Sequence, residues 1–166
     1  MSRYADVANK VDAFFTRVTD RHPGDMQCKS GCSDCCAVRL SVTAAEGDAI
    51  RDFLAGCSSD RRATLVANAR SAPPDRCAAL DPAGRCLIYD ARPIVCRSHG
   101  VPIRMTTASL PVVQACHRNF TERGPAAADP DCILDQTTLS ALVLAVDRAS
   151  GGDGTRYDLA ALLAEC

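Results

Sequence analysis

The sequence contains no tryptophan, and aromatic residues make up only 4% of its 166 residues. A core with so few rings has to be built from alanine, leucine, valine and isoleucine. No apolar run reaches the roughly 20 residues that a membrane-spanning helix needs, so we expect no membrane association. Residues 1–20 are amphipathic and mixed in charge, which predicts a surface helix and not a signal peptide.

Neither sign of charge is in excess, because 19 basic residues face 20 acidic ones and the net charge is −1. A nucleic-acid-binding surface needs a basic excess, so we expect no nucleic-acid partner. The chain also lacks the residue pattern of a Ser/His/Asp catalytic triad, a phosphate-binding glycine loop and a dinucleotide-binding fingerprint. No pair of carboxylates is placed for acid–base catalysis. These absences leave no hydrolytic or nucleotide-dependent activity to predict.

Cysteine, by contrast, is abundant, with 11 residues. Cys28-Lys-Ser-Gly-Cys32-Ser-Asp-Cys35-Cys36 places four thiols in nine residues, in a C-x3-C-x2-C pattern followed by one more cysteine. Without an export signal we expect a cytoplasmic, reducing location, where thiols persist. Soft thiolates this close together predict metal ligands and not disulfides.

The first cysteine loop leaves two questions open: the backbone conformation at Cys35 and Cys36, and the class of protein that the spacing indicates. Adjacent Cys35 and Cys36 cannot easily point the same way in an extended chain, so either the backbone folds sharply there or one of them serves a second centre. The C-x3-C-x2-C spacing is also the signature of radical enzymes that use S-adenosylmethionine. Their complete barrel needs about 250 residues, and no repeating βα pattern occurs here, so we set that interpretation aside.

Hydrophobic periodicity predicts a mainly α fold: one helical domain over residues 1–166, wrapped around cysteine-rich loops. Thr43-Ala-Ala-Glu46 is a capping box, and Thr155-Arg-Tyr-Asp158 caps a final helix. Leu87–Tyr89 is expected to be a short strand, Pro93 to open a short helix ending near Arg97, and 101–105 with 110–114 to form one small hairpin. The main helices are predicted at 4–20, 43–56, 59–71 and 136–148, with 136–166 as a helical C-terminal part.

The remaining cysteines belong to a longer pattern. The sequence continues with Cys77-x-x-Leu80, then Gly84-Arg-Cys86-x-Ile88-Tyr89-x-x-Arg92-Pro93-x-x-Cys96-Arg97, then Cys116. With the first loop, this string resembles the YkgJ-type cysteine-cluster family, described as zinc- or iron-chelating domains, over about residues 26–120. A related pattern occurs in the much longer flagellin lysine N-methylases, and the shorter length here argues against methylation.

The resemblance implies that eight cysteines are metal ligands. They are Cys28, Cys32, Cys35, Cys36, Cys77, Cys86, Cys96 and Cys116. Eight thiolates suit two tetrahedral metals, two four-iron clusters, or one cluster plus spare redox thiols. Cys57, Cys132 and Cys166 lie outside the motif and are expected to be small buried hydrophobes or a terminal thiol.

The spacing favours iron–sulfur over zinc. Structural zinc sites usually show two C-x2-C knuckles tens of residues apart. Here one dense loop joins remote cysteines, as in cluster ligation. We therefore predict a 4Fe–4S cluster with an electron-transfer or redox role, oxidoreductase-like if the protein is an enzyme, serving a redox or protein partner. The alternative is a zinc-binding structural or interaction module without catalysis; the oligomeric state stays open.

Residues near the cysteines are candidates for tuning the site. Arg92 and Arg97 bracket Cys96, and cations beside thiolates favour the charged form; Arg92 could instead pair with a local carboxylate. Tyr89 is expected to pack against the site. His99 and His117 lie within reach of a metal, although a lone histidine is more often a hydrogen-bonded structural residue. His22, before Pro23, is expected to be a helix-end residue.

Overall fold

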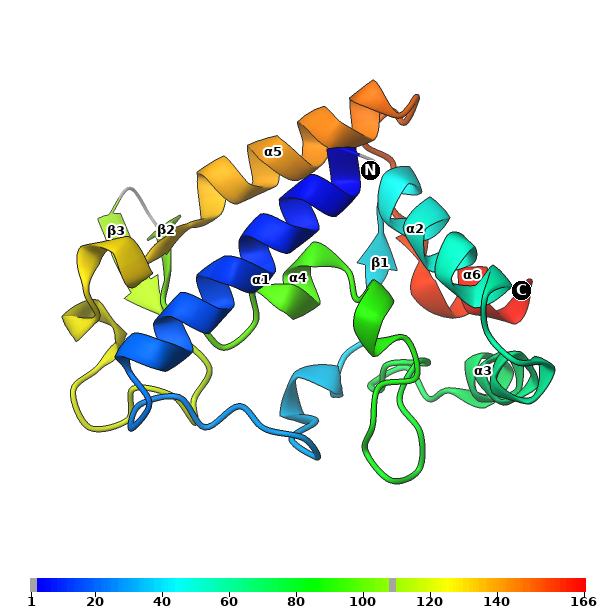
Figure 1. The fold of residues 1–166 in the computed structure, drawn as a ribbon, viewed down its shortest axis with the longest axis horizontal. Helices are drawn as coiled ribbons and strands as arrows, with labels where there is room; N and C mark the ends of the chain where they lie inside the picture. The colour runs from blue at the N-terminus through cyan, green and yellow to red at the C-terminus, as the bar shows by residue number, and fades with distance from the viewer. Residues whose placement is uncertain (1–2, 108–109) are drawn as a thin grey trace. The chain divides into compact units, whose positions relative to one another are not determined.

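The computed structural model of the chain describes residues 3–107 and 110–166 (Figure 1). Helices dominate these residues and short strands form two small sheets, so the mainly α prediction is confirmed. The α-helices are α1 (Arg3–Arg21), α2 (Ala44–Ala55), α3 (Ser59–Ser71), α4 (Ile94–Arg97), α5 (Gln136–Ala149) and α6 (Leu159–Ala164). The strands are β1 (Ser41–Val42), β2 (Ile103–Thr107), β3 (Leu110–Gln114), β4 (Leu134–Asp135) and β5 (Tyr157–Asp158). Among the described residues, no helix has both the length and the apolar character needed to cross a membrane.

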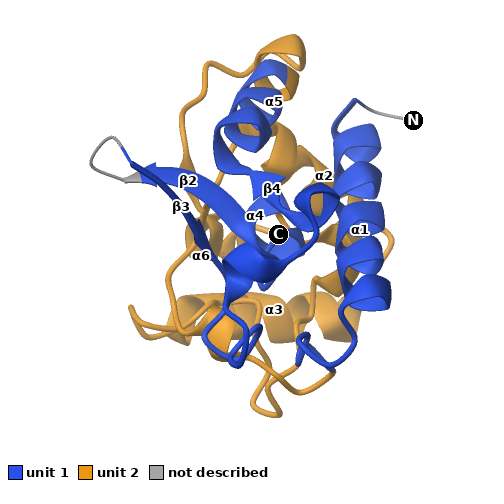
Figure 2. Cartoon of the chain, turned by 90° about the vertical axis from the view of Figure 1, so that its left-hand side faces the viewer, with its two compact units in different colours: residues 1–29, 94–145 blue, residues 30–93, 146–166 orange. Residues whose placement is uncertain are grey.

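The chain divides into two compact units, shown in separate colours in Figure 2. Unit 1 comprises residues 1–29 and 94–145, and unit 2 comprises residues 30–93 and 146–166. Each unit contains its own cluster of buried apolar side chains. The organisation of residues 1–166 as a single domain stays a prediction.

Unit 1 is built around α1, which packs against the short α4. The apolar side chains of α1 recur at helical spacing, and Val18 joins Phe120 and Cys132 in the core of the unit. Strand β2 pairs antiparallel with β3 and parallel with β4, in the order β3-β2-β4. The predicted hairpin is therefore confirmed, while the tip of its expected turn, at 108–109, lies outside the described residues.

Unit 2 packs α3 against α6. Leu65 of α3 and Leu159 and Leu163 of α6 are buried in its core. The predicted capping box at the start of α2 is confirmed, because the Glu46 amide donates to the Thr43 hydroxyl and the Thr43 amide donates to the Glu46 carboxylate. Two amides that have no partner inside the helix are thereby satisfied.

The predicted strand at Leu87–Tyr89 is wrong. Leu80 and Cys86 form an isolated antiparallel bridge, and the Leu87 amide donates to the Ala79 carbonyl at 2.8 Å. Pairing stops there, and the chain enters the 3-10 turn η2 (Tyr89–Ala91). A strand needs a neighbour along several residues, which this segment does not have. The short helix predicted after Pro93 is confirmed as α4.

Asp147 supports unit 2 from a fully buried position. Its Oδ1 atom accepts the amide of Ala45 in the first turn of α2 at 3.0 Å, and Oδ2 accepts the amide of Gly154 at 3.0 Å. The first amides of a helix have no intrahelical acceptor, so this carboxylate completes the start of α2. It also holds the glycine-rich turn that leads to β5.

Replacing this carboxylate should therefore destabilise the protein. We expect Asp147→Ala to lower the free energy of unfolding by about 2–4 kcal/mol, because it leaves buried amides without an acceptor. Asp48→Ala, which removes an exposed carboxylate of α2 paired with Arg51, should change it by about 0.5 kcal/mol or less. Urea unfolding followed by circular dichroism measures both. Equal effects of the two substitutions would contradict the role assigned to Asp147.

Candidate metal centre

The boundary between the two units lies inside the first cysteine loop, between Lys29 and Ser30. It divides the candidate ligands into two sets, each carried by its own unit. Unit 1 contains Cys28, Cys96 and Cys116, and unit 2 contains Cys32, Cys35, Cys36, Cys77 and Cys86. All of them are free thiols.

The part of the loop in unit 2 folds into the 3-10 turn η1 (Asp34–Cys36). The Cys36 amide donates to the Ser33 carbonyl at 2.8 Å and the Ala37 amide donates to the Asp34 carbonyl at 3.2 Å. This turn brings the Sγ atoms of Cys35 and Cys36 to 3.9 Å from each other. The backbone at this adjacent pair is therefore sharply folded, which was one of the two alternatives that the sequence left open.

One hydrogen bond joins this turn to the next cysteine segment, from the Cys77 amide to the Cys36 carbonyl at 2.8 Å. Cys77 is buried and belongs to the core of unit 2. Between Cys77 and Cys86 the chain reverses direction, and the Asp81 carboxylate accepts the Arg85 amide at 2.8 Å inside the reversal. The Leu80–Cys86 bridge then closes it, so that Cys86 returns toward Cys77.

Cys35, Cys36, Cys77 and Cys86 are close enough to affect one another's ionisation. The hydrogen bond from the Cys36 thiol lowers the pKa of Cys35 to about 6, and the same bond together with burial raises the pKa of Cys36. Burial raises the pKa of Cys77 and Cys86. In the metal-free protein Cys35 is therefore the thiolate of this group at neutral pH. We call these four residues the unit 2 thiol group.

Arg92 supplies positive charge beside the unit 2 thiol group. Its guanidinium lies over the ring of Tyr89, 3.6 Å from the ring centre, in a cation–π contact. After the Cys36 hydrogen bond and a backbone hydrogen bond, its charge helps to lower the pKa of Cys35. At Cys86 its charge opposes the larger effect of burial on the pKa. Tyr89 is 56% exposed, so its ring supports Arg92 at the surface and is not enclosed.

In unit 1, Asn119 organises the surroundings of Cys28. Its buried amide group donates to Cys28 Sγ at 3.3 Å and to the Gly100 carbonyl at 2.8 Å. Its backbone amide donates to the Cys116 carbonyl at 2.8 Å. Gly100 has a φ of +104°, and a Cβ atom there would lie 2.8 Å from Cys28 Sγ. A glycine is therefore required at this close approach.

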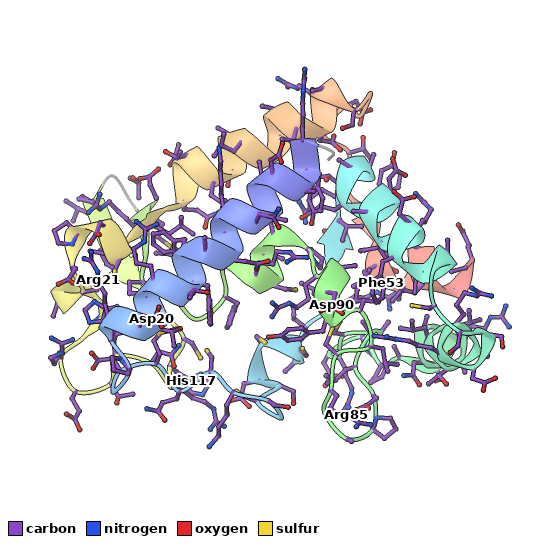
Figure 3. All side chains as sticks on the ribbon, viewed as in Figure 1. Asp20, Arg21, Phe53, Arg85, Asp90 and His117 are labelled. Atoms are coloured by element: carbon purple, nitrogen blue, oxygen red, sulfur yellow. The ribbon has the colours of Figure 1, made fainter. Side chains whose placement is uncertain are left out.

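Cys96 lies on α4, and His99 follows the end of that helix. Partial burial and the nearby His117 lower the pKa of His99, which places the two imidazoles close together. His117, labelled in Figure 3, adjoins Cys116 in the sequence. Within the motif, unit 1 thus offers three thiols, with two imidazoles nearby in the sequence. Arg97, expected to tune the site, is 8% exposed and pairs with Asp12 of α1.

Asn119 is the residue near these thiols that sequence reasoning missed. A single asparagine carries no motif, and the weak signal was its place in Cys116-His-Arg-Asn119, directly before the buried Phe120. Its Oδ1 atom also accepts the Gln27 amide at 2.8 Å, next to Cys28. Its side chain therefore joins the start of the first cysteine loop to the loop that carries Cys116.

Comparison with known proteins identifies the pattern as a family signature. The family model CxxCxxCC, described as "Putative zinc- or iron-chelating domain", matches residues 27–129. The match covers more than half of the chain and includes every candidate ligand of both units. No curated protein and no solved structure matches the chain.

The unusual pKa of Cys35 predicts selective alkylation of the metal-free protein. The thiolate is the nucleophile, so Cys35 should react with iodoacetamide above pH 6 and lose reactivity as the pH falls below its pKa of about 6. Mass spectrometry of the labelled peptide between pH 5 and 9 measures the midpoint. Cys36→Ala removes the hydrogen-bond donor and should move the midpoint upward, towards the ordinary value near 8.5. An unchanged midpoint in this variant would exclude Cys36 as the cause.

Proposed function

This chain belongs to the CxxCxxCC family of zinc- or iron-chelating domains, and from that premise we propose that it is an iron–sulfur protein with an electron-transfer or redox role. The proposal assigns a 4Fe–4S cluster to its cysteines. When bound, such a cluster supplies one-electron chemistry. The thiols hold it, and the nearby cations and amides adjust its charge.

The spacing of the unit 2 thiol group carries this proposal. Cys35 and Cys36 bring their Sγ atoms to 3.9 Å, yet among the described residues of unit 2 no third cysteine sulfur lies within 4.8 Å of both. One tetrahedral ion would need all four sulfurs about 3.8 Å apart, given metal–sulfur bonds of about 2.3 Å. A four-iron cluster places each thiolate on a different iron and spreads the sulfurs more widely. One close pair without a third sulfur beside it is not the compact four-sulfur set of a single tetrahedral ion, and this favours the cluster.

The electrostatic surroundings are consistent with a thiolate-bound centre. Burial disfavours the thiolate forms of Cys77 and Cys86, so in the metal-free protein they keep their protons. Metal binding displaces such protons and replaces them with positive charge. Arg92, held over Tyr89, supplies a further positive charge to the same group. The donor chemistry of these four residues thus fits the cluster.

The three motif thiols of unit 1 belong to the same proposal, which keeps all eight motif cysteines as ligands. Hydrogen bonds to ligand sulfur raise or lower cluster potentials. In unit 1, Asn119 makes such a bond to Cys28. His99 and His117 are further donors beside Cys96 and Cys116. Asn119, His99 and His117 are therefore suited to adjust the potential of a second metal centre or to complete its ligand set.

Zinc is the second candidate, and one distance favours it. The 3.9 Å between Cys35 Sγ and Cys36 Sγ nearly equals the separation of about 3.8 Å expected for two thiolates on one zinc ion. In that case the protein is a structural or interaction module with complete thiolate coordination and no catalysis. The two candidates differ in colour, in metal content and in the presence of sulfide.

A reducing compartment completes the proposal. The structure contains 11 free cysteines, and thiols in such number persist where glutathione and thioredoxin keep them reduced. We propose that the protein works in the cytoplasm, where it exchanges electrons with a redox partner. The net charge of −1 is consistent with a protein partner and lacks the basic excess that nucleic acid binding needs.

Anaerobic purification distinguishes the two candidates directly. We expect a brown protein with broad absorption near 400 nm and about four iron and four sulfide per cluster, because sulfide-bridged iron absorbs visible light. Metal analysis and an absorption spectrum of the same sample measure this. A colourless protein that contains one or two zinc ions after the same handling would replace the cluster by the structural module.

Single replacements test the ligand assignment. Cys32→Ser, Cys86→Ser and Cys96→Ser should each lower the metal content and the thermal stability, because each removes one proposed ligand. The matched controls are Cys57→Ser and Cys166→Ser, which lie outside the motif and should leave metal content unchanged. Metal analysis with thermal unfolding measures all five variants. Full metal content in all three ligand variants would overturn the assignment.

A further inference from the structure

Three potential metal ligands meet in unit 1 away from the cysteine motif. They are His22, directly after α1, and Asp129 and Cys132, at the two ends of the segment that contains the 3-10 turn η4 (Pro130–Cys132). One donor atom from each lies within 4.8 Å of the other two. His22 and Cys132 fall outside the span that the family model matches. We call these residues the His22 cluster.

The backbone holds the donors in place. The His22 amide continues the α1 pattern by donating to the Val18 carbonyl at 2.9 Å, and its ring contacts Phe120 edge-on at 5.3 Å. The Cys132 amide donates to the Asp129 carbonyl at 2.8 Å, which closes the turn η4. Contacts between α1 and η4 join the two segments. The three side chains therefore meet on a packed scaffold.

The two ring nitrogens of His22 have different surroundings. Nε2 faces the cluster, 3.8 Å from Asp129 Oδ2, and it also accepts the Asp129 amide at 3.4 Å. Nδ1 lies 3.8 Å from Asp25 Oδ2 and 3.2 Å from an Arg123 guanidinium nitrogen, and Arg123 also pairs with Asp25. Nε2 binds a metal when it gives up the bond from the Asp129 amide and the ring proton lies on Nδ1, beside the Asp25 carboxylate. Arg123, which can only donate, then gives up its contact with Nδ1 and keeps its pairing with Asp25. Metal-binding histidines commonly have such a carboxylate behind them.

The distances and the charges suit one divalent cation. Tetrahedral zinc with bonds of about 2.0–2.3 Å separates its ligand atoms by roughly 3.3–3.8 Å, close to the 3.8 Å between His22 Nε2 and Asp129 Oδ2. One thiolate and one carboxylate together neutralise a divalent ion, which lowers the cost of placing it beside the buried Cys132. Asp129 is 50% exposed on its side chain and gives access from solvent.

We propose that His22, Asp129 and Cys132 bind a zinc-type divalent cation, with a fourth position open to water. A mixed set of imidazole, carboxylate and thiolate is a borderline donor set, which zinc and cobalt accept more readily than magnesium or calcium. Arg21, labelled beside the end of α1 in Figure 3, pairs with both Asp129 and Asp131. On binding, Asp129 turns from Arg21 to the cation, and Asp131 keeps Arg21 in place.

Cobalt and cadmium, added to the full-length chain, test this site independently of the motif. We expect the wild-type protein to bind one equivalent of Co²⁺ more than Cys132→Ser. We also expect a ¹¹³Cd resonance from the mixed ligand set, distinct from any all-thiolate signal, that is absent in this variant. Cys57→Ser is the matched control and should keep the additional equivalent of Co²⁺ and the ¹¹³Cd resonance. Identical stoichiometry and spectra for wild type and Cys132→Ser would overturn the site.

A pair of surface variants keeps the test decisive if Cys132→Ser does not fold. Asp129→Asn removes a proposed ligand, whereas Asp131→Asn removes the neighbouring carboxylate that shares the same arginine. We expect the first to weaken Co²⁺ binding at this site by at least about tenfold and the second to leave it unchanged. Equal affinity in the two variants would mean that His22, Asp129 and Cys132 form a hydrogen-bonded cluster without a metal role.

Discussion

The hydrogen bond from the Cys77 amide to the Cys36 carbonyl is the contact on which the thiol arrangement of unit 2 depends. Cysteine-rich loops have no regular ladder of hydrogen bonds, so their geometry has to be set by a few specific contacts with a packed core. This bond joins an exposed turn to a residue of the apolar core. Through it the helices α3 and α6, which carry no motif cysteine, indirectly position the sulfurs of Cys35 and Cys36.

In unit 1 a side chain, that of Asn119, fixes the position of a thiol. Asn119 bonds to Cys28, to the loop around Gly100 and to the backbone at Cys116. A buried amide with all of its hydrogen-bonding groups satisfied specifies geometry, because losing any one partner leaves a polar group unpaired. Both units therefore position thiols by polar contacts with a packed core. This common principle fits a protein in which loops carry the chemistry and helices supply rigidity.

Several features were predictable because they depend on neighbouring residues alone. The capping box at Thr43 and Glu46 and the short helix after Pro93 follow from local rules, and the structure contains both. The family assignment likewise needed only the spacing of cysteines along the chain. The strand expected at Leu87–Tyr89 was wrong, because pairing depends on a partner that the local sequence does not reveal. Asn119 was missed for a similar reason, since its partners are remote in sequence.

The sequence by itself determined the secondary structure of the helices, the identity of the candidate thiols and the family, because these depend on periodicity and spacing. Only the tertiary structure decided which thiols share a unit and which of them has a lowered pKa. It also decided that His22, Asp129 and Cys132 meet, although more than 100 residues separate the first from the others. Side chains that are distant in sequence come together when their segments pack against one core. The spacing of residues along the chain does not reveal that packing.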